Sequence, residues 1–205
     1  MTHLLLTKLR LKNAEIQEFY FPHQLDCRGC NQCFYKSELN CPDAEEIQPI
    51  IASLDDAELI IVESPCYCMG MTGSLKCFLD HLAYMWLSHR PHPQMFHKVG
   101  VVLSCCGGAG AKRVTKDLAE HLMCWGIPQI YQFPMILNSP DWESIPSEIM
   151  SKLEHTADRL APKITKALSH PHSTFKSRYI FKMMQKNQKQ NVWNPLDKTY
   201  WQETG

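Results

Sequence analysis

The chain has 205 residues, of which 44% are hydrophobic and 20% are charged, and its formal net charge is zero. This composition is typical of a soluble globular protein, and a neutral chain gives no electrostatic reason to expect a nucleic-acid partner. No stretch approaches about 18 uninterrupted apolar residues, so the sequence predicts no membrane span. The first residues do not resemble a signal peptide. We therefore expect a cytoplasmic protein.

Strand and helix patterns alternate along residues 1–168. The expected elements are a helix end over 1–12, a strand over 14–21, a helix that opens with a capping box at 43–46 and is kinked by Pro49, a strand over 59–62, a helix over 75–86, a strand over 99–103, a helix over 112–125, a strand over 129–137 and a helix over 149–168. This alternation predicts an α/β fold, a doubly wound parallel sheet between two layers of helices. The composition changes at His170, and residues 169–205 are expected to form a helical, aromatic appendage to the 1–168 domain.

Four of the ten cysteines fall within one loop, residues 26–42. Cys27, Cys30 and Cys33 are separated by gaps of two residues, and Cys41 follows after a longer gap. Closely spaced thiols around a glycine can reach different corners of one four-iron four-sulfur cluster. Zinc is an alternative, although it usually takes cysteines in two separated pairs. The remaining alternative is a set of free thiols that bind nothing.

Two further loops follow buried strands, where α/β sheets bind ligands. We call residues 64–73 the first strand-end loop and residues 104–110 the second strand-end loop. Their glycines allow close approach of backbone amides ahead of a helix, and the first contains an aromatic side chain suited to a flat ligand. The candidate cofactor-binding residues are Ser64, Pro65, Cys66, Tyr67, Thr72, Gly73, Ser104, Gly107, Gly108 and Gly110.

The order of these motifs resembles the iron–sulfur flavoproteins and the related flavodoxin-like, NAD(P)H-dependent flavin reductases. The resemblance extends over about residues 14–168 and is most specific in the cysteine loop and in the segment from Ser64 to Lys76. It implies a five-stranded parallel sheet that binds FMN at its strand ends, usually in a dimer. It also implies that Pro65, Tyr67, Thr72 and Gly73 line the isoalloxazine, that Ser104, Gly107, Gly108 and Gly110 flank its other side, and that Cys27, Cys30, Cys33 and Cys41 hold the cluster.

Three features depart from the family pattern. The gap between Cys33 and Cys41 is long, and Cys66 stands where an aliphatic residue is usual. The family's first strand and its phosphate-binding loop have no counterpart before the opening helix, so the sheet's first strand is expected to be missing. Either the chain is an N-terminally shortened form, or something else fills the gap. Such a chain should bind FMN weakly and favour it little over riboflavin.

The resemblance implies an FMN-dependent oxidoreductase or electron carrier. Electrons would pass from NAD(P)H or a ferredoxin-like donor through FMN and a four-iron four-sulfur cluster, without a side chain acting as acid or base. The alternative is a flavodoxin-like binding module or remnant without tight flavin, its cysteines free or zinc-bound. Trp193, Tyr200 and Trp201 lie on a tail that looks too short to bury them, which predicts a homodimer or a dimer of dimers.

Overall fold

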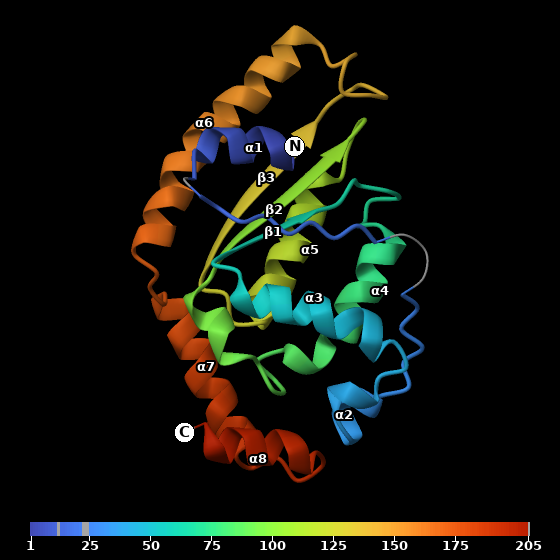
Figure 1. Ribbon diagram of the computed structural model, residues 1–205, viewed down its shortest axis with the longest axis vertical. Coiled ribbons are helices and arrows are strands. Elements are labelled where there is room, and N and C mark those ends of the chain that lie inside the picture. Colours follow the sequence, from blue (N-terminus) through green and yellow to red (C-terminus); the bar gives the residue numbers. More distant parts are fainter. Residues whose placement is uncertain (12, 22–24, 205) are drawn as a thin grey trace.

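The computed structural model describes residues 1–11, 13–21 and 25–204 (Figure 1). Its centre is a parallel sheet with the strand order β1 (Leu59–Glu63), β2 (Val99–Cys106) and β3 (Gln129–Ile136). Residues 99–104 of the middle strand are all buried, because helices cover both of its faces. The three apolar runs predicted as strands are therefore confirmed.

Helices form a layer on each side of the sheet, which confirms the predicted α/β class (Figure 1). On one face, α1 (Thr2–Leu9) and α6 (Ser147–Ser169) share a core with Val101, Leu103 and Phe133. The opposite core joins the sheet to α3 (Ala44–Asp56), α4 (Gly73–His81) and α5 (Ala111–Cys124).

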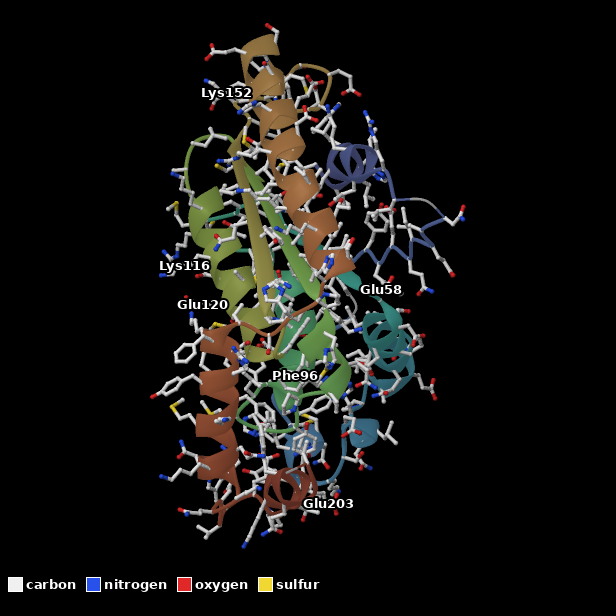
Figure 2. All side chains as sticks on the ribbon, turned by 90° about the vertical axis from the view of Figure 1, so that its left-hand side faces the viewer. Glu58, Phe96, Lys116, Glu120, Lys152 and Glu203 are labelled. Carbon is white, nitrogen blue, oxygen red and sulfur yellow. The ribbon has the colours of Figure 1, made fainter. Side chains whose placement is uncertain are left out.

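Each covering helix presents an apolar stripe to the sheet. In α5 the buried stripe includes Val114, Leu118 and Leu122, while Figure 2 shows Lys116 and Glu120 on the outer surface. Helix α3 continues through Pro49 to its end. Short helices complete the domain: α2 (Gln32–Tyr35) and the 3-10 turns Glu38–Asn40, Ala83–Met85 and Pro93–His97. Within the described residues, no helix has the length and apolar character that crossing a membrane requires.

The strand predicted over residues 14–21 is wrong. These residues are extended but belong to no sheet, and Ile16 and Tyr20 are mostly exposed. Only the end of the segment joins the core, where the Phe21 ring stacks on Phe78 with 4.3 Å between centroids. Alternating side chains show that a segment has two different faces, but a strand also needs a neighbour that completes its backbone hydrogen bonds.

Strand β1 has a partner on one edge only, as far as the described residues go. The Glu58 carbonyl and the Ser64 amide bond to β2, so the backbone groups of the odd-numbered residues between them point to the other edge. Within the part of the chain that the structure describes, this edge of β1 is therefore open.

The C-terminal segment contains α7 (Phe175–Gln188) and α8 (Pro195–Glu203) and packs against the lower part of the domain (Figure 1). Trp201 is fully buried, and its indole nitrogen donates to the His89 carbonyl over 2.6 Å. Phe96 meets Phe181 of α7 with 5.1 Å between ring centroids, and Figure 2 shows Phe96 on the side where α7 lies. The expectation that the tail cannot bury its aromatic residues is wrong for Trp201, whereas Trp193 remains 60% exposed.

Candidate functional site

The first strand-end loop is a tight turn whose polar atoms bond mainly to one another. The buried Ser64 hydroxyl accepts a hydrogen bond from the Thr72 amide at 3.0 Å and donates to the Pro65 carbonyl at 2.9 Å. Tyr67 and Gly70 exchange two backbone hydrogen bonds of 2.9 Å. Thr72 caps α4 through its hydroxyl. These bonds fix the loop and leave the Tyr67 ring 65% exposed.

The second strand-end loop begins later than predicted. Ser104, Cys105 and Cys106 belong to strand β2, because each continues the register with β3. Ser104 is fully buried, and its hydroxyl has no hydrogen-bond partner among the described residues. The hydroxyl therefore lies inside the fold and not on the surface that a flavin would contact.

The glycines of this loop leave open space at the edge of the sheet. Gly107 and Gly108 are exposed, and no atom lies within 4 Å of the position that a Cβ would occupy on either residue. The same holds for Gly73 at the start of α4. A flat ligand could therefore approach the backbone closely at these three positions.

The two strand-end loops pack directly against each other. The Cys66 amide donates to the Cys105 carbonyl at 2.8 Å. Gly110 has a φ of +107°, and a Cβ added there would stand 2.3 Å from the Cys66 sulfur. The predicted cofactor residues of the two loops thus lie side by side at the carboxyl ends of β1 and β2. This arrangement suits one planar ligand shared by both loops.

The Glu63 carboxylate, next to the first strand-end loop, accepts hydrogen bonds from the N-terminus of α1. The Thr2 amide and hydroxyl donate to one oxygen of Glu63, over 3.0 and 2.6 Å. Burial opposes ionisation of Glu63, but the Thr2 hydrogen bonds and the nearby terminal ammonium outweigh it and lower its pKa. A helix N-terminus attracts anions, so any phosphate arriving here would compete with Glu63.

The four predicted metal ligands line a single cavity. Cys27, Cys30, Cys33 and Cys41 all face a cavity of about 240 Å³, which we call the cysteine pocket. Gly29, between the first two cysteines, has a φ of +63°, which allows the sharp curl that brings the thiols together. The four cysteines thus line one cavity, and their role as metal ligands stays a prediction.

Burial opposes ionisation of two of the four thiols that line the pocket, Cys33 and Cys41. Burial, followed by the charges of the other three cysteines, raises the pKa of Cys33 to about 11. Burial also raises the pKa of Cys41. The negative charge of one thiolate opposes ionisation of Cys33, and a bound cation would relieve that repulsion.

Two residues of the pocket were missed by the sequence analysis. Asp43 begins α3 but makes no capping hydrogen bond with its side chain, so the predicted capping box is wrong. Its carboxylate lies 2.8 Å from Nε2 of the buried His81. The other nitrogen of His81, Nδ1, lies 2.8 Å from the Cys77 carbonyl, which only accepts and so places a proton on Nδ1. Cys41, Asp43 and His81 bring their ligand atoms within 4.8 Å of one another.

Helix α4 connects the strand-end loops to the cysteine pocket. It begins at the Thr72 cap, and its last residues, Asp80 and His81, line the pocket. A nine-residue helix is about 13 Å long at a rise of 1.5 Å per residue. The two candidate sites are therefore separated by the length of one short helix.

The family model described as NADPH-dependent FMN reductase matches residues 3–139, which include both strand-end loops and the cysteine pocket. The chain belongs to the NADPH-dependent FMN reductase family. An iron–sulfur flavoprotein of Archaeoglobus fulgidus is 24% identical over 154 residues, which are 75% of this chain and 61% of the relative. An iron–sulfur flavoprotein of Methanocaldococcus jannaschii is 37% identical over 54 residues, 26% of this chain and 27% of the relative. The chain thus matches about three fifths of the first relative's length and a quarter of the second's.

Two solved structures share the fold. An NADH:FMN oxidoreductase in its apo form superposes with a TM-score of 0.54 at 17% identity, covering 86% of this chain and 83% of its own. A flavone reductase gives a TM-score of 0.57 at 15% identity, with 84% of this chain and 59% of its own covered. At these identities the likeness shows the flavodoxin-like fold that the sequence predicted.

Proposed function

We propose that this chain is an FMN-dependent oxidoreductase that couples a flavin at the strand-end loops to an iron–sulfur cluster in the cysteine pocket. The observation that carries the proposal is the convergence of Cys27, Cys30, Cys33 and Cys41 on one cavity. Membership in the FMN reductase family supports the flavin half. Bound FMN supplies hydride and single-electron chemistry, and a four-iron four-sulfur cluster carries single electrons.

On the flavin side, the chain's contribution is to bind and orient a flat ring. Tyr67 offers an exposed aromatic face, and Gly107 and Gly108 are exposed, with open space where a side chain would stand. Hydrogen bonds between Ser64, Pro65 and Thr72 hold the first strand-end loop in shape before a ligand arrives. Such preorganisation lowers the entropy cost of binding.

In the cysteine pocket, the chain supplies four sulfur ligands and limits their exposure to water. Cys27, Cys33 and Cys41 are half-buried, while Cys30 is exposed. Sulfur ligands suit iron–sulfur clusters, whereas the mixed group of Cys41, Asp43 and His81 suits a single zinc ion. The three thiols outside the mixed group favour the cluster.

The electron donor proposed is NAD(P)H or a ferredoxin-like protein, delivering electrons to FMN about one helix length from the cysteine pocket. All ten cysteines are free, which supports a reducing compartment such as the cytoplasm. We also propose a homodimer that uses the exposed Trp193. If so, Trp193→Ser should lower the mass measured by sedimentation; an unchanged dimer would remove Trp193 from the interface.

Anaerobic purification followed by spectroscopy and metal analysis tests the proposal. We expect flavin absorption, with iron and sulfide in equal amounts near four per chain. Cys30→Ser should lose the cluster, while the matched variant Cys124→Ser, on the distant helix α5, should keep it. Fewer than about two irons per chain, or one zinc without sulfide, would overturn the cluster assignment.

A further inference from the structure

A buried ion pair connects the C-terminal helix to the backbone of the third cysteine. Asp197, in the first turn of α8, is fully buried. One guanidinium nitrogen of Arg90 donates to this carboxylate, and the other terminal nitrogen donates to the Cys33 carbonyl. The second oxygen of Asp197 lies 2.7 Å from Nδ1 of His89. One continuous set of contacts therefore runs from α8 through Arg90 to Cys33.

The turn that carries Cys33 is short, and its Cys33 and Phe34 side chains pack against the core only partly buried. Helix α2 contains four residues, and none of them is buried. The carbonyl of Phe34, the residue after Cys33, accepts a hydrogen bond from the Asn194 side chain at 3.4 Å. The Phe34 ring also contacts the His89 ring edge-on, with 4.6 Å between centroids. Two consecutive carbonyls of the cysteine turn are thus held by residues distant in the sequence.

We propose that Arg90, fixed by Asp197, is a positioning residue for the metal centre in the cysteine pocket, and that α8 is part of that site. The planar guanidinium reaches two acceptors at once and holds the Cys33 backbone in the orientation that directs its thiol into the pocket. Contacts behind a ligand orient it, and their loss typically weakens metal binding about 10- to 100-fold. This inference rests on the proposed function, because it assumes that the four cysteines bind metal.

Arg90→Lys tests the bridge directly. Lysine keeps the positive charge beside Asp197, but its single nitrogen cannot reproduce the fork that also reaches Cys33. The probe is Co²⁺, titrated anaerobically into protein with free thiols and followed by its thiolate absorption bands. We expect binding about tenfold weaker or more, and an altered spectrum and reduction potential once iron and sulfide are loaded. Limited proteolysis should show α7 and α8 as well protected as in the unchanged protein.

The control is Asp55→Asn, which alters another carboxylate–histidine contact. An Asp55 oxygen lies 2.9 Å from Nδ1 of His92, two residues after Arg90, and neither Asp55 nor His92 lines the cysteine pocket. It should bind Co²⁺ normally. If Arg90→Lys loosens α7 and α8, a double variant replaces it: Arg90→Met/Asp197→Leu, which restores apolar packing without the bridge. Co²⁺ binding must remain weakened in that double variant. Normal Co²⁺ affinity and spectra in either bridge-free protein with a docked tail overturn the inference. Failure of the unchanged protein to bind Co²⁺ or iron would instead overturn the proposed function.

Discussion

Replacing Gly110 by alanine should force apart the two strand-end loops. Gly110 has a φ of +107°, which costs an alanine about 1–2 kcal/mol. Its Cβ would stand 2.3 Å from the Cys66 sulfur and 3.2 Å from the Met69 sulfur, and such overpacking costs about 1–3 kcal/mol. The free energy of unfolding should therefore fall by about 2–5 kcal/mol, and flavin binding should weaken because both loops contribute to it.

Urea unfolding followed by circular dichroism measures this loss. Gly108→Ala is the matched control, because it adds the same methyl group in open space and should change stability by less than about 0.5 kcal/mol. Adding Cys66→Ala to Gly110→Ala removes the closer of the two sulfurs, so most of the steric part of the loss should be recovered, while the contact with Met69 and the backbone part remain. If Gly110→Ala is as stable as Gly108→Ala, the loops do not pack as described.

Three other predictions follow from single contacts. Gly126→Ala should destabilise the fold by about 2–4 kcal/mol in the same assay, because φ is +104° and the new Cβ would lie 2.5 Å from the Phe96 ring; stability unchanged would contradict the packing. Glu63→Gln should raise the preference for FMN over riboflavin about two- to fivefold in fluorescence titrations, because it removes a negative charge near the Thr2 amide. Without metal, Cys33 should react with a disulfide reagent roughly tenfold more slowly near pH 8 than an ordinary thiol. Its pKa of about 11 lowers the thiolate fraction about a hundredfold, and the higher nucleophilicity of that thiolate recovers part of the lost rate. Equal rates would show an unburied thiol.

The middle strand of the sheet could be predicted from the sequence because it is buried on both faces. Val99 to Leu103 is a continuous apolar run, and such a run in an α/β pattern has few other uses. The segment 14–21 shows the limit of the same reasoning. Its alternation describes the segment alone, whereas pairing depends on a neighbour elsewhere in the chain.

The candidate sites divide in the same way. The cysteine spacing is local, so Cys27, Cys30 and Cys33 could be assigned to one pocket before the fold was known. Asp43 was assigned to a capping box for an equally local reason, namely its position before α3. In the structure, the Asp43 carboxylate instead contacts His81, 38 positions along the chain. A capping pattern cannot exclude such a distant partner.

The C-terminal segment lies outside the part of the chain that the family match covers. The match ends at residue 139, after the strand-end loops and the cysteine pocket but before α6, α7 and α8. Yet α6 covers one face of the sheet, and Asn194 and Asp197 hold the turn that carries Cys33. Removing residues beyond Gln190 would therefore leave Arg90 without its buried partner and uncover the space that Trp201 fills. A weaker dimer after that truncation would reflect damage to the fold as readily as a lost interface, so an exposed single-site change at Trp193 is the sharper test of association.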